Sequence, residues 1–451
     1  MKNSFCVFFL AFCINIACIS ASLCAQEIEP ARLNTIKYGT ETEIAVLIQS
    51  LKAEGADYLD NELIALVENT RNTKILSGLF AFFGDREKSG LEDRAIRAIT
   101  ERDDEANETV IAAVDYLGKV KAAAAAPALM ELLDSQERRF MNNTFRALGR
   151  AAGADEAGVD ETAEYLIDYY TNRDPGDDNR RDIIIAIGAT GSAKGVPFLA
   201  EIAGNNDERI ALRIAALDSL SKAGGSEGLE AILSCVTSGD PNVRSSAVAA
   251  LGPYSGEAVD SAILEAFRDS YYRTRIAAAQ ASRERRLTAA VPYLKFRAER
   301  DDVPNVKDES IRALGAIAND EAMETMNALF TERKNSDRVR LVSAEMLMKN
   351  DPSQYLSRLI VELDEAKQKN QTPLYNGFLK IIGESKAESM ETITRRFLQN
   401  GGMLEKSYGL DMASNNNLIS LSEEIKTLAG DKNESLARKA RRTAEKLGIE
   451  L

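Results

Sequence analysis

Few side chains in this sequence could do chemistry, and their types exclude most kinds of active site. The 451 residues contain no histidine and five cysteines. Histidine is the commonest general base and a frequent zinc ligand, and serine and cysteine triads depend on it. The run GATGSAKG at 188–195 is not a P-loop, since neither serine nor threonine follows Lys194. We therefore expect no catalytic residue, no cofactor and no metal site.

Two groups of basic side chains remain as candidates for binding. The central group places two tyrosines beside five arginines: Tyr271, Tyr272, Arg273, Arg275, Arg283, Arg285 and Arg286. Because tyrosine and arginine are the usual anchors of protein interfaces, we predict that this group contacts a protein partner, with a solvated surface as the alternative.

The second group lies near the end of the sequence and comprises Arg438, Lys439, Arg441 and Arg442. Its simplest interpretation is a polar face that covers the exposed end of a repeat array. Contact with an acidic partner or with anionic lipid headgroups is the alternative.

The overall charge limits the classes of partner. The formal net charge is −14, and residues of both signs are spread along the chain. Wrapping nucleic acid requires a basic face, so we expect no nucleic-acid partner.

The stretch from Gly239 to Asp269 shows which elements would position these side chains. Asp240 is a suitable helix N-cap, and a proline follows it at the first helical position. Apolar residues then recur on one face up to Leu251, and a glycine and a proline end the helix. A second amphipathic helix begins near Glu257. A two-helix hairpin of this size cannot bury both apolar faces without neighbours.

The same hairpin recurs along the sequence with a period of about 33 residues. Its marker is an apolar residue followed by glycine near the end of each first helix. The clearest markers are Phe83-Gly84, Leu117-Gly118, Leu148-Gly149, Ile187-Gly188, Leu251-Gly252, Leu314-Gly315, Ile382-Gly383 and Leu447-Gly448. A basic residue often stands eight positions before the marker. The repetition predicts about twelve helix pairs.

This pattern resembles the HEAT-like repeats of the phycobilisome-lyase type. The closest copies are GDPNVRSSAVAALG at 239–252 and VPNVKDESIRALG at 303–315. The resemblance implies an all-α fold, an α-solenoid that winds as a right-handed superhelix, continuous over 41–451 after a lead-in at 26–40. It also implies that acidic and basic positions form a structural ladder between repeats, with ligand contact as the alternative: Arg180, Arg213, Asp240, Arg244, Lys307 and Arg340.

Residues 1–25 read as a secretory signal peptide. Lys2 precedes an apolar run over 5–19 and then small residues, with plausible cleavage after Ala25. Lipid attachment at Cys18 or Cys24 and an uncleaved anchor are the alternatives. After cleavage only Cys235 remains, for which we expect a buried, inert thiol, with a redox role as the alternative.

These observations favour a non-catalytic scaffold exported to the periplasm or cell envelope, where it binds a protein or peptide partner. The alternatives are an enzyme-accessory protein of the bilin-lyase kind, which rests on resemblance alone, and a lipid-anchored structural tether. Membrane contact is expected only if the chain is lipidated or keeps its signal segment.

Overall fold

The computed structural model describes residues 30–153, 158–173, 175–387 and 389–451. The predicted signal segment at 1–25 lies outside these residues. Within them the regular secondary structure is helical, and no strand occurs. The predicted all-α solenoid is therefore confirmed. Two compact units are present, 1–228 and 229–451, and each is described by itself. The sequence also predicts one uninterrupted array of repeats over 41–451. That prediction concerns how the two units are joined, and it stays a prediction.

Unit 1 begins with a helix inside the predicted lead-in, α2 (Pro30–Tyr38), which packs against α3 and α4. The further α-helices of unit 1 are α3 (Glu41–Glu54), α4 (Asp60–Asn69), α5 (Thr73–Asp85), α6 (Glu92–Thr100), α7 (Asn107–Lys119), α8 (Ala126–Asp134), α9 (Arg138–Ala152), α10 (Val159–Asn172), α11 (Asp177–Thr190), α12 (Gly195–Gly204) and α13 (Ile210–Ala223). The boundary between the units falls inside α14 (Ser226–Cys235).

Unit 2 continues the same alternation. Its α-helices are α15 (Pro241–Ala250), α16 (Glu257–Ala266), α17 (Tyr272–Arg285), α18 (Val291–Arg300), α19 (Pro304–Ile317), α20 (Asp320–Thr331), α21 (Asp337–Asn350), α22 (Pro352–Gln368), α23 (Thr372–Glu384), α24 (Met390–Asn400), α25 (Met403–Asn415), α26 (Ser422–Ala429) and α27 (Glu434–Leu447). In chain order the described helices make twelve pairs, α3/α4 to α25/α26, followed by α27.

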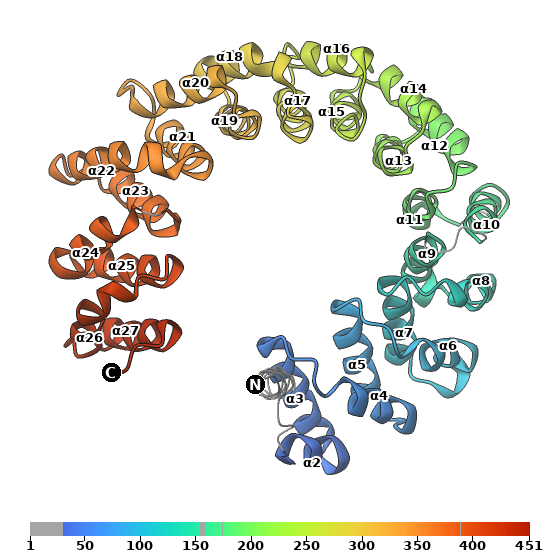
Figure 1. Cartoon of the computed structure of the whole chain (residues 1–451). Helices are drawn as coiled ribbons and strands as arrows, with labels where there is room; N and C mark the ends of the chain where they lie inside the picture. Colours follow the sequence, from blue (N-terminus) through green and yellow to red (C-terminus); the bar gives the residue numbers. More distant parts are fainter. Residues whose placement is uncertain (1–29, 154–157, 174, 388) are drawn as a thin grey trace, which may run out of the picture. The chain divides into compact units, whose positions relative to one another are not determined.

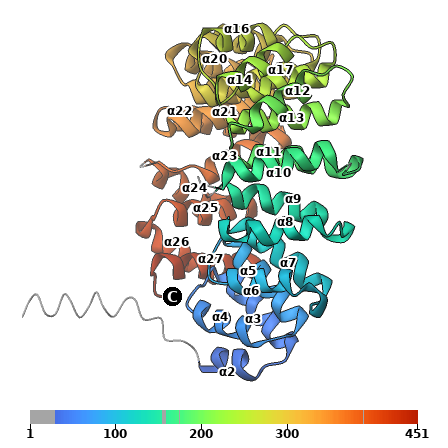
Figure 2. The same ribbon diagram turned by 90° about the vertical axis from the view of Figure 1, so that its right-hand side faces the viewer.

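Each unit has two layers (Figures 1 and 2). The odd-numbered helices form one layer, in which each helix contacts the next odd-numbered helix of its unit. The even-numbered helices form the other layer. From α4 to α26, every even-numbered helix except α14 packs more extensively against the odd-numbered helix that follows it than against the one before it. The second helix of a hairpin therefore buries most of its apolar face on the next repeat, as a solenoid requires.

The hairpin at 239–269 forms as its sequence predicts. The Asp240 carboxylate accepts hydrogen bonds from the backbone N–H groups of Asn242 and Val243 at 2.8 and 3.1 Å, so it caps α15. Val243 on α15 and Leu251, the residue that caps the end of this helix, are fully buried. Local capping and helical periodicity thus set these boundaries.

The marker glycines are where neighbouring odd-numbered helices come closest, and most lie inside the last helical turn. A methyl carbon on Gly118 would lie 2.7 Å from the Cα of Ala147 on the next odd-numbered helix. On Gly149 it would lie 2.7 Å from the Cα of Ala186. These two glycines therefore let two helix backbones approach, whereas Gly448 ends α27 as its C-cap, with a left-handed φ of 67°.

Cys235, the last residue of α14, is buried, as predicted. Among the helices that the structure describes, none is both long and apolar enough to span a lipid bilayer.

We predict that Gly149→Ala lowers the free energy of unfolding by about 1–3 kcal/mol, because the added methyl forces α9 away from α11. Gly204→Ala is the matched control, since its methyl would meet no described atom within 4 Å. Both changes raise the helix propensity by a similar amount, so the difference between the two changes in unfolding free energy isolates the steric effect. Urea unfolding followed by circular dichroism measures it. Equal midpoints for the two variants would contradict the close-approach role.

Candidate partner-binding surface

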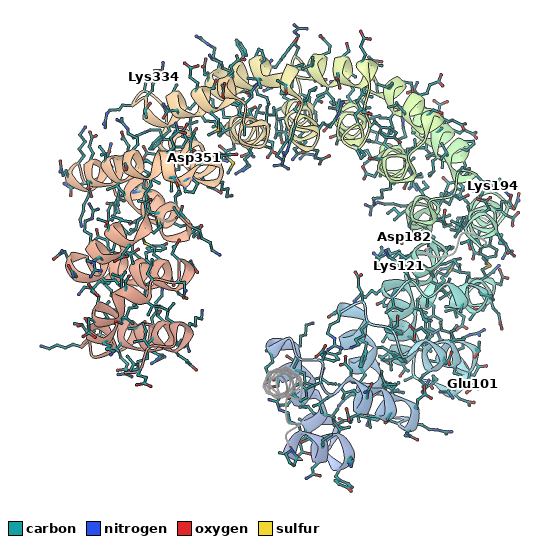
Figure 3. All side chains as sticks on the ribbon, viewed as in Figure 1. Glu101, Lys121, Asp182, Lys194, Lys334 and Asp351 are labelled. Atoms are coloured by element: carbon teal, nitrogen blue, oxygen red, sulfur yellow. The ribbon has the colours of Figure 1, made fainter. Side chains whose placement is uncertain are left out.

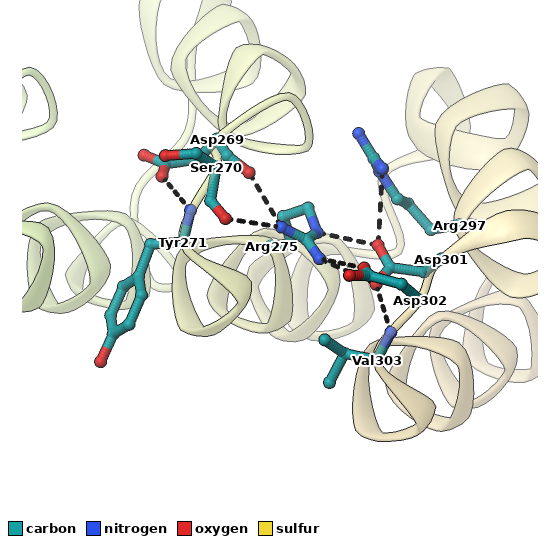
Figure 4. Close-up of polar contacts among 8 residues, drawn as sticks. All are labelled: Asp269, Ser270, Tyr271, Arg275, Arg297, Asp301, Asp302 and Val303. Atoms are coloured by element: carbon teal, nitrogen blue, oxygen red, sulfur yellow. Dashed lines mark hydrogen bonds and ion pairs between the residues drawn. The ribbon is translucent and has the colours of Figure 1, made fainter.

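In the central arginine group, Arg275 on α17 makes the most extensive link between two repeats (Figure 4). Its Nε and Nη2 each donate to the Asp301 carboxylate at 2.8 Å, and Asp301 precedes the next odd-numbered helix. Its Nη1 donates to the backbone carbonyls of Asp269 and Ser270 at 3.0 and 3.1 Å. The Arg275 guanidinium thus fixes both the loop before its own helix and the loop before the next odd-numbered helix, α19.

Arg244 on α15 makes the same set of contacts one repeat earlier. Its Nη1 donates to the carbonyls of Ser238 and Gly239 at 3.0 and 3.2 Å. Its Nε and Nη2 donate to the Asp269 carboxylate at 2.8 and 3.1 Å. The repetition shows that the contact belongs to the repeat. Bidentate arginine–carboxylate geometry makes it directional as well as strong.

The carboxylates of these links stay charged although they are buried. The Asp301 side chain has no exposed surface. Burial alone would raise the pKa of Asp301, but hydrogen bonds from Arg275 and from the Val303 backbone outweigh it and hold this pKa below its usual value. The resulting stabilisation is present above the ordinary carboxyl pKa of about 4 and is lost as the pH falls through the lowered value.

The other predicted ladder residues use related contacts. In α13 and α21, the Nε atoms of Arg213 and Arg340 each donate at 3.0 Å to a carbonyl of the preceding helix, at Ala203 and Phe330. Arg340 also pairs with the buried Glu362 at 2.7 Å. Lys307 reaches the Glu299 carbonyl at 3.0 Å, and the Arg180 guanidinium lies 4.8 Å from the ring centre of Tyr170.

Asp240, which was predicted to belong to the ladder between repeats, caps its own helix. The acidic partner of Arg244 is Asp269, 25 residues further along. This corrects the prediction that the nearby acidic position completes the ladder.

The structure divides the central group and removes Arg275 and Arg285 from the surface available to a partner. Arg275 is buried, which corrects its assignment as a partner contact. Arg285 is paired with Asp260 on α16, and its side chain is 12% exposed. Arg283 pairs with Glu309 on α19 at 2.5 Å.

What remains exposed lies at the two ends of α17. Tyr271, Tyr272 and Arg273 are together at the start, where Arg273 Nε donates to the Tyr272 hydroxyl at 3.2 Å and the two tyrosine rings are 5.4 Å apart. Arg286 is exposed just after the helix, with a left-handed φ of 49°. Fourteen helical residues separate these ends by about 20 Å. The tyrosine end is the compact candidate surface.

The second basic group lies on α27. Its members Arg438, Lys439 and Arg442 line a groove between α27 and α25, whereas Arg441 is not part of that lining and lies 3.8 Å from Glu434. Sequence reasoning found the basic residues but missed the other wall, because α25 lies about 30 residues upstream. The available signal was the spacing of Arg438, Arg442 and Lys446, which places them on one helical face.

No residue set in the described part of the chain suggests a metal centre: no group of three or more cysteine, aspartate or glutamate side chains is placed to hold an ion there.

Comparison with known proteins places the repeats in a family. The family described as Spirochaete HEAT repeat protein matches residues 36–443. This confirms the predicted HEAT-like repeats, whereas the finer resemblance to the phycobilisome-lyase type stays a prediction. A search of curated proteins finds no match.

The chain is also similar in fold to solved HEAT-repeat structures. Kap121p bound to Pho4p is 11% identical with a TM-score of 0.45 over 96% of this chain, and unbound Kap121p is 12% identical with a TM-score of 0.44 over 92%. The chain covers 55% and 53% of those two chains, about half their length. Human deoxyhypusine hydroxylase is 16% identical with a TM-score of 0.26, over 60% of this chain and 98% of that one.

We predict that Arg275→Met lowers the free energy of unfolding by about 3–5 kcal/mol, because it leaves the buried Asp301 carboxylate without its main partner. Lys349→Met is the control: it removes a pair with Glu345 in which the two side chains are 65% and 42% exposed, and we expect almost no change. Urea titration of both variants at neutral pH measures the difference. If Arg275→Met lowered the free energy of unfolding as little as Lys349→Met does, the structural role of the Arg275–Asp301 pair would be refuted.

Proposed function

This chain belongs to the spirochaete HEAT repeat protein family, and we propose that it is a non-catalytic scaffold that binds a protein or peptide partner on the surface of its helix stacks. The observation that carries the proposal is that many of its charged side chains hold neighbouring repeats together. The arginines that the sequence concentrates are largely engaged in holding repeats together, as Arg244, Arg275 and Arg340 show.

The sequence supports the absence of catalysis in this proposal. A chain without histidine lacks the usual general base, and the single cysteine after residue 25 is buried. What the fold offers instead is a large, regular surface on which partners are recognised by shape and charge.

Within that surface we propose the tyrosine end of α17 as a contact site. Tyr272 is partly exposed, and the fully accessible Arg273 hydrogen-bonds to its hydroxyl. An aromatic ring held beside a guanidinium loses little side-chain freedom on binding, which is why such pairs act as interface anchors.

Crosslinking in the cell tests the proposal. A photoreactive phenylalanine analogue at Tyr272 should give a discrete, reproducible crosslinked protein. The same analogue at Phe296 on α18, an aromatic residue that is 52% exposed, is the matched control and should not give that product. Identical products from both positions would refute the surface assignment. If no protein is crosslinked from either position, and the purified chain instead turns over a bound small molecule, the scaffold proposal is wrong.

We further propose that the chain is exported to the cell envelope as a soluble protein, on the basis of the charge and hydropathy pattern of residues 1–25. Mass spectrometry of the protein from its native cell should find an N-terminus at Gln26 without lipid. A lipid-modified start at Cys18 or Cys24 would favour the membrane tether instead, and an intact Met1 would contradict cleavage.

A further inference from the structure

The groove between α25 and α27, which we call the basic groove, has a charge opposite to that of the whole chain. It has a volume of about 460 Å³. The helix α27 contributes Arg438, Lys439, Arg442 and Lys446 to its lining, and the only ionisable lining residue from α25 is Asp411. Four cations and one carboxylate give the lining a net charge of +3, on a chain whose net charge is −14.

One pairing rule recurs along the odd-numbered helices: a basic side chain pairs with a carboxylate one repeat away. Asp182 on α11, labelled in Figure 3, accepts hydrogen bonds from Arg146 of α9 at 3.0 and 3.1 Å. Arg338 on α21 pairs with Asp308 on α19 at 2.6 Å. Lys439 in the basic groove follows this rule, with Asp411 at 2.6 Å and the Ser407 hydroxyl at 2.9 Å.

The three other cations of the basic groove depart from the rule. Arg438, Arg442 and Lys446 are exposed, and the described part of the chain provides none of them with an ion-pair partner. Three like charges held on one helical face repel one another, by a few tenths of a kcal/mol per adjacent pair. An anionic ligand would relieve that repulsion.

The wall that carries these cations is fixed in place. On its buried face α27 places Leu436, Ala440, Ala444 and Leu447 in a core cluster with residues of α24, α25 and α26. The cations therefore keep their spacing when a ligand arrives, and binding costs little reorganisation of the backbone.

The spacing of the cations indicates the shape of the ligand. Residues four positions apart on a helix are separated by about 6 Å along its axis. Alternate side chains of an extended peptide point the same way and are about 6.6–6.8 Å apart. An extended segment with an acidic residue at every second position would thus place one carboxylate near each cation.

The uncharged lining suits a peptide backbone. Ser414, Asn415 and Ser435 offer hydroxyl and amide groups that can exchange hydrogen bonds with peptide N–H and C=O groups. Met403 is 59% exposed and lies beside the start of α27, where its sulfur is 3.6 Å from Asn433 Nδ2. An apolar ligand side chain would find its contact there, at the Arg438 end.

We propose that the basic groove binds an extended acidic segment of a partner protein, with carboxylates at alternate positions facing Arg438, Arg442 and Lys446 and an apolar side chain against Met403. This inference rests on the proposed scaffold function and specifies the chemistry of one of its partners. In this proposal the basic side chains of α27 form one wall of a binding groove, whereas the sequence suggested a polar face that covers the end of the repeat array.

Fluorescence anisotropy with the full chain tests the proposal. The probe is the labelled peptide Leu-Gly-Asp-Ser-Glu-Ser-Asp-Ser, and the control peptide Leu-Gly-Ser-Asp-Glu-Asp-Ser-Ser has the same composition with its acidic residues adjacent. We expect saturable binding of the probe, weaker binding of the control peptide, and affinity that falls as salt is added.

Two double variants with the same change in charge locate the site. Arg438→Glu with Arg442→Glu should weaken probe binding by about tenfold or more, which corresponds to about 1.4 kcal/mol. Lys334→Glu with Lys349→Glu alters two exposed lysines of unit 2 outside the groove and should change affinity by less than about twofold. Lys446→Glu alone provides a second groove variant, and helical circular dichroism verifies that each variant is folded.

Equal probe binding by the wild type and the groove variants would overturn the proposal, and so would equal binding of the two peptides. Sedimentation with phosphatidylserine vesicles that depends on Arg438 and Arg442, without probe binding, would assign the groove to a lipid surface instead. If the probe fails to bind while crosslinking from Tyr272 persists, the groove assignment is wrong and the scaffold function stands.

Discussion

The structure depends on one constraint: a pair of short amphipathic helices cannot bury both of its apolar faces alone. The even-numbered helices from α4 to α26, apart from α14, show how the chain satisfies it, because each packs more extensively on the next repeat than on its own hairpin partner. The odd-numbered helices meet through small residues such as Gly149 and Ala186. Stability in such an arrangement is approximately the sum of weak units and strong nearest-neighbour interfaces.

The charged side chains serve the same constraint. A buried ion pair is usually a poor source of net stability, because desolvation offsets attraction. Arg275 and Asp301 meet that cost with additional hydrogen bonds: the arginine also donates to two loop carbonyls, and the aspartate also accepts from a backbone N–H. These contacts fix the loops between repeats, so the spacing of the helices follows from directional bonds as well as from packing. Many of the arginines are consequently structural, and the proposed binding surfaces use arginines for which the described residues provide no carboxylate partner.

How much the sequence predicts depends on how local each feature is. The cap at Asp240 and the start of α16 at Glu257 were predictable, because both depend on neighbouring residues only. The period predicted the HEAT-like repeats, since it is repeated many times, and the family itself came from comparison with known proteins. The close approach at Gly149 was not predictable, because the atoms that Gly149 must avoid belong to a helix about 37 residues away.

The sites show the same limit. Arg275 and Arg273 look equivalent in sequence, yet one is buried against Asp301 and the other is exposed beside Tyr272. The difference arises because the acceptor of Arg275, the Asp301 carboxylate, belongs to the loop before the next odd-numbered helix, and the local pattern does not reveal that contact. For the same reason, the sequence revealed only the wall of the basic groove that α27 forms. The second wall is formed by α25, which lies in the preceding repeat. Sequence therefore predicts the repeat well and its surface poorly.

The central claim is that a helix pair is folded by its neighbours, and a fragment tests it most directly. A synthetic peptide of residues 239–269 contains α15 and α16 with their caps intact. The account predicts a circular dichroism spectrum dominated by unfolded chain in aqueous buffer, without a cooperative thermal transition. A peptide that is largely helical and melts cooperatively as a monomer would contradict it.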